Sequence, residues 1–169
     1  ALSFDIMCTV SSGLRGAQRI SHLVQSMKSY SYMDRGAQQI IDVHDGIEDT
    51  LQLFAYKFKQ GIEIRRNYDR SLPQILAFGS ELNQVWTNLI DNAVDAIAGK
   101  GVIELATAQN GDYIQVQIID SGSGIPVEIQ SRIFEPFYTT KPVGKGSGLG
   151  LDAVRRIVEN RHQGTSTFA

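Results

Sequence analysis

The chain has 169 residues, of which 20% are charged, and its formal net charge is −2. This length suits one domain core with a helical extension. The near-neutral charge gives no electrostatic case for a nucleic-acid binder, which usually carries a clustered basic surface. No apolar run is long enough to span a membrane, no secretory leader is evident, and Cys8 alone can form neither an internal disulfide nor a zinc site. We therefore expect a cytoplasmic domain, whether or not its parent protein is anchored to a membrane. The chain starts without a methionine and ends in TSTFA, which resembles the start of a strand, so we expect it to be a fragment of a larger protein.

An amphipathic helix is predicted for residues 14–34. Its apolar positions recur at spacings of three and four residues. Such a helix either packs on its own domain or forms one arm of a bundle whose partner lies outside this chain. The positions that define the face are Leu14, Ile20, Leu23, Val24, Met27 and Ser31.

Strands and helices are predicted to alternate after Gly36. Short strands are expected at 38–44, 62–68 and 74–78, and Asp45 is expected to cap a helix that stops at Gly61. The second half predicts a helix over 81–98 capped by Ser80, a hairpin of 102–108 and 113–120 around the turn Asn110-Gly111, a short helix after Pro126, and a last helix over 149–161. This order predicts an α/β two-layer sandwich, with a mixed sheet covered by helices on one side.

A polar stripe follows the predicted helix 81–98. Glu81, Asn88, Asn92 and Asp95 are spaced by seven, four and three residues, so they share one face. A stripe of this kind is often only the solvated side of a helix. Asparagine, however, is a poorer helix former than Glu, Lys or Gln, and its amide oxygen is a hard ligand suited to magnesium that already carries phosphate. Asn92 is therefore a candidate metal ligand, with Asn88 one turn earlier.

A carboxylate ends the strand 113–120. Asp120 is followed by Ser-Gly-Ser-Gly, and its oxygens can accept a hydrogen bond from the exocyclic amino group of adenine. Gly122 and Gly124 allow the backbone to approach a flat ring closely. The alternative is an ordinary Asp-Ser-Gly turn.

A glycine-rich loop, GKGSGLGL (144–151), precedes the last predicted helix. Backbone amides at such a helix start bind phosphate, although the spacing is neither that of a Walker loop nor that of a dinucleotide fingerprint. A bare flexible loop is the alternative. Before this loop, Phe134 and Phe137 can anchor a mobile strip, which allows Lys141 or Lys145 to swing over the phosphates.

Taken in order, four blocks match one family. ELNQVWTNLIDNAVDAI (81–97) resembles the N box, DSGSGIP (120–126) the first glycine box, IFEPFYTTK (133–141) the F box and GKGSGLGL the second glycine box. These are the motifs of the catalytic ATP-binding domain of sensor histidine kinases, within the group that includes gyrase B, MutL and the ninety-kilodalton heat-shock chaperone. The Phe-Tyr-Thr-Thr-Lys variant is most similar to nitrogen-regulation-type kinases.

The resemblance implies a Bergerat-type ATP-binding domain over residues 37–169, with a truncated C-terminal strand and a lid over 138–147. Residues 1–36 would contain the second helix of a dimerisation and phosphoacceptor hairpin. The implied cofactors are ATP and Mg²⁺, with Asn92 and Asn88 as metal ligands. The implied ATP-binding residues are Asn88, Asn92, Asp95, Asp120, Gly122, Gly124, Ile125, Phe137, Thr140, Lys141, Gly144, Lys145, Gly146, Ser147, Gly148, Leu149 and Gly150.

A phosphoacceptor histidine is not found in this chain. His22, His44 and His162 all lack the following acidic residue and nearby proline of the family motif, except that Asp45 follows His44. The resemblance thus implies a protein-histidine kinase whose acceptor lies on a segment outside this chain, so the fragment would not phosphorylate itself alone. Implied partners are that hairpin, from the same protein or its dimer mate in a homodimer, and a response regulator. An ATP-hydrolysing relative and a non-catalytic nucleotide-sensing module are the alternatives.

Overall fold

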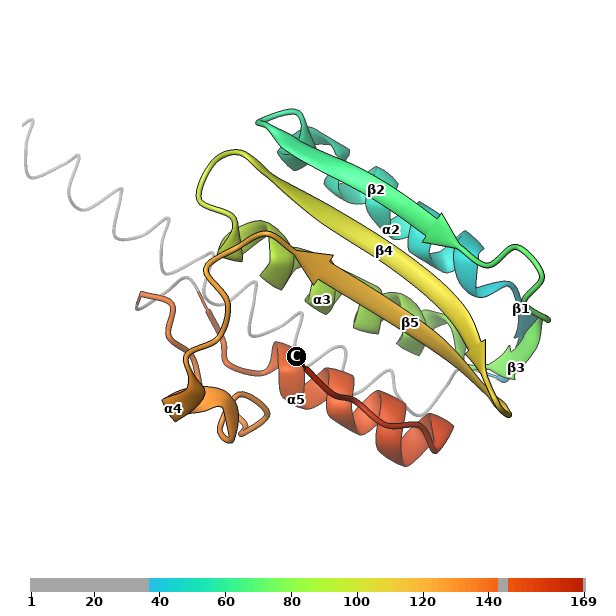
Figure 1. Cartoon of the computed structure of the whole chain (residues 1–169). Coiled ribbons are helices and arrows are strands. Elements are labelled where there is room, and N and C mark those ends of the chain that lie inside the picture. The colour runs from blue at the N-terminus through green and yellow to red at the C-terminus, as the bar shows by residue number, and fades with distance from the viewer. Residues whose placement is uncertain (1–36, 143–145, 169) are drawn as a thin grey trace, which may run out of the picture.

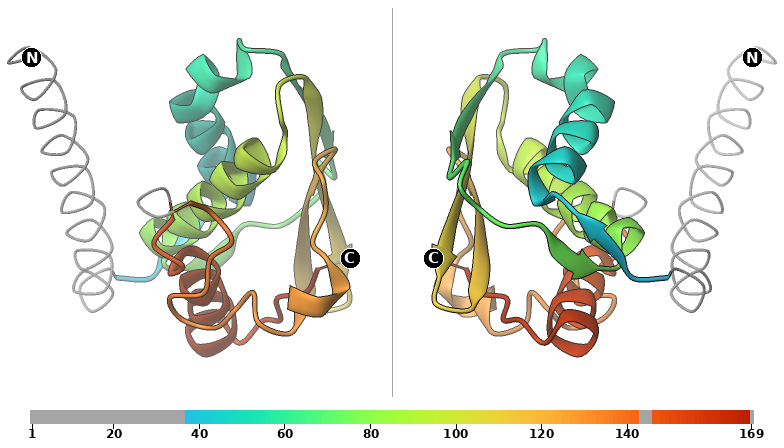
Figure 2. Two further views of the ribbon diagram at one scale, coloured as in Figure 1. Left: turned by 90° about the vertical axis from the view of Figure 1, so that its left-hand side faces the viewer. Right: turned by 90° about the vertical axis from the view of Figure 1, so that its right-hand side faces the viewer.

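The computed structural model describes residues 37–142 and 146–168. They form two layers, with a sheet on one side and helices on the other (Figures 1 and 2). The main sheet has the order β2 (Ile62–Tyr68), β4 (Gly101–Asn110), β5 (Tyr113–Asp120); β2 runs parallel to β4, and β5 antiparallel to it. The predicted mixed sheet with helices on one side is therefore confirmed.

Three helical segments cover one face of this sheet. They are α2 (Val43–Phe58), α3 (Gly79–Ala96), and α5 (Gly150–Arg155), which continues as the π-helix η1 (Arg156–Arg161). The short α4 (Val127–Gln130) lies beyond the end of β5 (Figure 1), and β1 (Gln39–Ile41) pairs antiparallel with β3 (Ile75–Ala77) in a second small sheet. None of the helices in the described ranges has the length and apolar character needed to cross a bilayer. The helix predicted at 14–34 lies outside the described residues.

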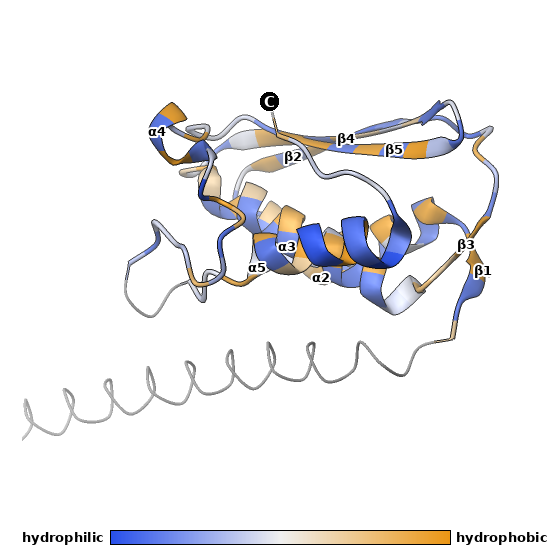
Figure 3. Cartoon of the chain, turned by 90° about the horizontal axis from the view of Figure 1, so that it is seen from below, coloured by the Kyte–Doolittle hydropathy of each residue, from blue (hydrophilic) through white to orange (hydrophobic). Residues whose placement is uncertain are grey.

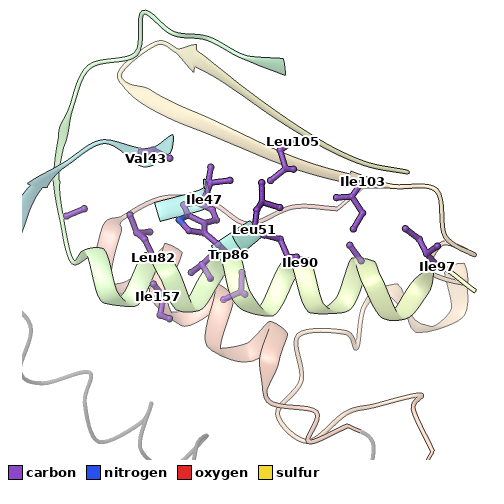
Figure 4. Packing of buried hydrophobic residues seen from close by; sticks show 14 residues of the cluster. Val43, Ile47, Leu51, Leu82, Trp86, Ile90, Ile97, Ile103, Leu105 and Ile157 are labelled. Atoms are coloured by element: carbon purple, nitrogen blue, oxygen red, sulfur yellow. The ribbon is translucent and has the colours of Figure 1, made fainter. Parts of the chain in front are cut away.

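The core lies between the sheet and α3. Alternation along β4 points Ile103 and Leu105 inward, and both are fully buried; Figure 3 shows the alternating hydrophilic and hydrophobic bands along the strands. Beneath them lie Trp86 and Ile90 of α3 (Figure 4). Each such side chain contributes about 1.5–3 kcal/mol by leaving water. Ile90 is fully buried in this layer.

Helix α2 begins earlier than predicted. Asp42, not Asp45, is its N-cap: the Asp42 carboxylate accepts from the His44 amide at 2.8 Å. The strand expected over 38–44 shrinks to Gln39–Ile41. The reason is the core, since starting the helix at Val43 places Val43, Ile47 and Leu51 on one buried face.

Two further local predictions are wrong. Ser80 does not cap α3. The N-cap residue is Phe78, and no side chain forms a capping hydrogen bond there. The hairpin turn consists of Gly111 and Asp112, because Asn110 pairs directly with Tyr113, and Gly111 has a φ of 60°. The turn therefore falls one residue later than the Asn-Gly signal suggests, and it puts the glycine where a positive φ is required.

Candidate nucleotide-binding site

The polar stripe on α3 divides into two parts. Glu81 is buried, with 4% exposure, and its carboxylate lies 3.1 Å from the Arg161 guanidinium. Asn88, Asn92 and Asp95 lie further along the helix and are partly or fully exposed. The stripe predicted from spacing is therefore wrong at Glu81, because the end of η1 packs over the first turn of α3 and supplies a cation there.

The F-box segment reaches α3 through one side chain. The Lys141 ammonium donates to Asp95 Oδ2 at 2.5 Å and to Asn92 Oδ1 at 3.2 Å. The Lys141 side chain is 30% exposed and that of Asp95 is 43% exposed. Two of the predicted site residues on α3 thus share one cation with the segment predicted as a lid.

The F-box segment also touches the glycine loop. The Phe137 amide donates to the Gly148 carbonyl at 2.8 Å. Gly148 has a φ of 68°, and a Cβ there would overlap the Phe137 backbone, so a side chain is excluded for two reasons. A Cβ on Gly146 would lie 2.6 Å from Thr139 Oγ1. These approaches place residues 146–148 directly against residues 137–141.

The two phenylalanines of the F box differ in role. Phe134 is partly buried, with its ring centroid 6.2 Å from that of Phe168 and 5.7 Å from the Arg155 guanidinium. Phe137 is 72% exposed and has a φ of 67°, which is rare for a residue with a side chain. Only Phe134 is an anchor, and the expectation that Phe137 serves as a second one is wrong; Phe137 is held through its backbone.

Two close approaches complete the arrangement. A Cβ on Gly150 would lie 3.4 Å from Asn88 Oδ1, so the start of α5 rests against α3. A Cβ on Gly122 would lie 2.7 Å from both Cβ and O of Ala96, so the first glycine box rests against the end of α3. The other three sequence blocks therefore all contact α3, which carries the first block.

Asp120 lies at the exposed end of β5. Its Oδ1 accepts from the Gly122 amide at 2.8 Å, which fixes the carboxylate. A carboxylate accepts several hydrogen bonds and donates none. The second oxygen therefore remains open to a donor such as an amino group.

The remaining predicted residues lie on the rim of this region. Ile125 is 39% exposed, and Thr140 is exposed on the F-box segment. Ser147 accepts from the Leu149 amide at 3.3 Å, directly before α5. Gly144 and Lys145 lie outside the described residues, and Gly124 is exposed with a φ of 70°.

Comparison with known proteins decides the family. The model of the histidine kinase-, DNA gyrase B-, and HSP90-like ATPases matches residues 79–169, more than half of the chain. The chain belongs to this family. As a member, it is an ATP-binding domain.

Individual relatives of this ATPase family agree. The chain is 35% identical to the sensor histidine kinase ZraS of Escherichia coli K12 over 154 residues, which is 90% of this chain and 32% of ZraS. It is 32% identical to the sensory histidine kinase/phosphatase NtrB of Rhodobacter capsulatus over 162 residues, 87% of this chain and 44% of NtrB. The chain thus spans less than half the length of these relatives. Among solved structures, histidine kinase ThkA in complex with the response regulator TrrA matches with a TM-score of 0.69 at 26% identity, over 86% of this chain and 42% of that one.

The donor set of this family member suits a hard cation. In the described part of the chain, no three His, Cys, Asp or Glu side chains gather as a metal site. Asn92 Oδ1 and Asp95 Oδ2 nevertheless both accept from the Lys141 ammonium. This ammonium occupies the place that a metal ion would take. One or two protein oxygens combined with phosphate oxygens are the usual ligands of Mg²⁺, so the residues present fit that ion. The sequence did not indicate that Asp95 shares a cation with Asn92, because the lysine that joins them lies 46 positions from Asp95.

Proposed function

We propose that the chain is the ATP-binding catalytic domain of a two-component sensor histidine kinase. In this role it transfers the γ-phosphate of ATP to a histidine on a helical hairpin, and that hairpin then serves a response regulator. The observation that carries the proposal is Asn88, which rests against Gly150 at the start of α5. The ATP-hydrolysing relatives that the sequence resembles carry a glutamate at the position of Asn88, where it activates water. An amide cannot act as a general base, so Asn88 favours transfer over hydrolysis.

The proposed nucleotide lies between α3 and the F-box segment. Asp120 accepts from the adenine amino group, and the Gly122 amide, held against Ala96, donates to Asp120 Oδ1 and orients the carboxylate. Asn92, supported by Asn88 and Asp95, holds the magnesium ion, which when bound neutralises phosphate charge. Backbone amides of residues 146–150 bind phosphate oxygens at the start of α5.

Two histidines of the described segments are unsuited as phosphoacceptors. His44 is buried, with Nε2 2.9 Å from Thr107 Oγ1 and Nδ1 3.1 Å from Asp42. His162 accepts from the Phe78 amide through Nε2 at 3.2 Å and lies 2.9 Å from the Ile157 carbonyl through Nδ1. Both nitrogens of each ring are used to hold the fold, which supports an acceptor elsewhere. The proposed source is a hairpin of the parent protein or its dimer mate.

The test combines the chain with γ-labelled ATP, Mg²⁺ and the separately produced acceptor hairpin of the parent protein. Label on the hairpin supports the proposal. Free phosphate alone would indicate a hydrolase, and neither product would indicate a nucleotide-sensing module; either result overturns it. Asn88→Glu is the informative variant, because it supplies the missing base and is expected to raise free phosphate at the expense of label on the hairpin.

A further inference from the structure

The Lys141 ammonium lies on the oxygens assigned to the metal. It donates to Asn92 Oδ1 and to Asp95 Oδ2, and the two residues are spaced by one helical turn on α3. An ammonium and a divalent cation both require these lone pairs, so they cannot use them together. The ammonium is the weaker competitor once phosphate oxygens add to the ligand set of the ion.

The two aspartates near the end of α3 each pair with a different lysine. Lys57 of α2 donates to Asp91 Oδ1 at 2.6 Å, on the neighbouring acidic position of the same helix. Its pKa is raised: burial works against the charge, but the hydrogen bond to Asp91 and the charges of Asp91 and Asp95 outweigh it. Asp91 is thus neutralised from α2, which leaves Asp95 to the F-box segment.

The position of Lys141 also links the lid to the glycine loop. A Cβ on Gly146 would lie 3.1 Å from the Lys141 Cβ, and the Lys141 amide donates to Thr139 Oγ1 at 3.1 Å. The stem of Lys141 therefore packs against the loop proposed to bind phosphate, while its head is bound to α3. Release of the head would leave the ammonium close to that loop.

From these contacts we propose that Lys141 is a specificity-determining residue that reserves the cation site for a metal ion bound to nucleotide. Without nucleotide, its ammonium occupies Asn92 and Asp95 and excludes a free divalent cation. With nucleotide and its metal ion bound, the ammonium would give up Asn92 and Asp95 and would lie near the phosphates beside residues 146–148. This inference rests on the proposed role of Asn92 and adds the order in which cations occupy it.

The test measures binding of Mn²⁺ alone, without nucleotide, from the loss of its free electron paramagnetic resonance signal. Lys141→Met is expected to bind Mn²⁺ about two- to fivefold more tightly than the unaltered chain, the range that a half-exposed ion pair supports. Lys141→Arg keeps the charge and should bind as the unaltered chain does. Lys141→Met combined with Asp95→Asn should lose the gain.

Lys57→Met is the matched control. It also removes one lysine charge beside α3, the one that pairs with Asp91, but it leaves Lys141 in place. If Lys57→Met raises Mn²⁺ affinity as much as Lys141→Met does, the proposal is overturned. It is also overturned if Lys141→Met does not bind Mn²⁺ more tightly than the unaltered chain, or if neither of these two chains binds Mn²⁺ detectably. Thermal unfolding of each variant verifies that it is folded. Since the assay contains neither ATP nor hairpin, a failed phosphotransfer leaves its result unaffected, and the two failures are distinguishable.

Discussion

Glu81 and Arg161, eighty positions apart, form a partly buried ion pair that joins the first turn of α3 to the last residue of η1. Arg161 Nε lies 3.3 Å from both carboxylate oxygens, and the guanidinium also lies 4.3 Å from the Phe78 ring. Next to it, the Phe78 amide donates to His162. Helix α3 carries Asn88 and Asn92, and η1 continues α5, which begins at the end of the glycine loop. The ion pair therefore fixes the position of the glycine loop relative to the two asparagines.

Glu81→Gln is expected to destabilise the chain. The side chain of Glu81 is 5% exposed and that of Arg161 is 33% exposed. Breaking the pair should therefore lower the free energy of unfolding by about 2 kcal/mol, which is less than the loss for a completely buried pair. Urea unfolding measures the change. Glu159→Gln is the control, since its Arg155 partner is 56% exposed and such a pair contributes less than about 1 kcal/mol. Equal losses for both variants would contradict a special role for Glu81.

Gly148→Ala is expected to weaken nucleotide binding through the Phe137 contact. The added Cβ overlaps the Phe137 backbone at a φ of 68°, so the loop and the F-box segment must separate. Gly111→Ala is matched in φ, at 60°, but its Cβ meets nothing within 4 Å. It should cost about 1 kcal/mol of stability from backbone strain alone and leave ATP affinity unchanged. Calorimetric titration with ATP and thermal unfolding separate the two; an unaltered ATP affinity in Gly148→Ala would refute the expectation.

Asp120→Asn tests adenine recognition. The new amide oxygen can still accept from the Gly122 amide, as Oδ1 does at 2.8 Å, while its NH₂ group opposes the amino group of adenine. We expect ATP affinity to fall about tenfold or more, the value of one hydrogen bond to a charged acceptor. Asp112→Asn, in the hairpin turn, should bind ATP normally. The adenine assignment is lost if both variants bind ATP equally well.

The fold class could be predicted from the sequence because periodicity reports burial. The strand 62–68 was predicted with the bounds that β2 has, and the hairpin was misplaced by one residue. Helix starts were harder. Asp42, Asp45 and Ser80 are all able to cap a helix, and packing decides where each helix begins. Helix α2 begins at Val43 because Val43 is buried in the core. At the start of α3, the Phe78 amide donates to His162 instead of to a local capping side chain.

The site could be predicted as a set of blocks but not as a set of contacts. Spacing along one helix placed Asn88, Asn92 and Asp95 in one stripe with Glu81, but Glu81 pairs with Arg161, eighty positions away. The contact between Lys141 and Asp95 spans 46 positions, and no local pattern predicts it. The π-helical turn of η1 likewise has no signal in the sequence, because the same apolar spacing fits an α-helix.

Acid unfolding should depend on Glu48. Its pKa is held below the ordinary value, first by the hydrogen bond from Arg66, at 2.7 Å, and also by that from Tyr68, at 2.9 Å. Because the folded state has the lower pKa, Glu48 contributes stability above the unfolded pKa of about 4.5 and loses it as the pH falls through the folded value. The Arg66 side chain is 41% exposed, so solvent screening limits the contribution to about 1 kcal/mol or less.

Glu48→Gln removes this dependence, and urea unfolding between about pH 6 and pH 3 measures it. The stability difference from the unaltered chain should be largest near pH 6 and should shrink as Glu48 becomes protonated in both states. Glu63→Gln is the control, since the Glu63 pKa is also lowered by an arginine, Arg65, but both side chains of that pair are exposed. Its pH-dependent difference should be smaller, because water competes for both partners. A difference for Glu48→Gln that stays constant across the range would show that the Arg66 and Tyr68 contacts do not stabilise the ionised carboxylate.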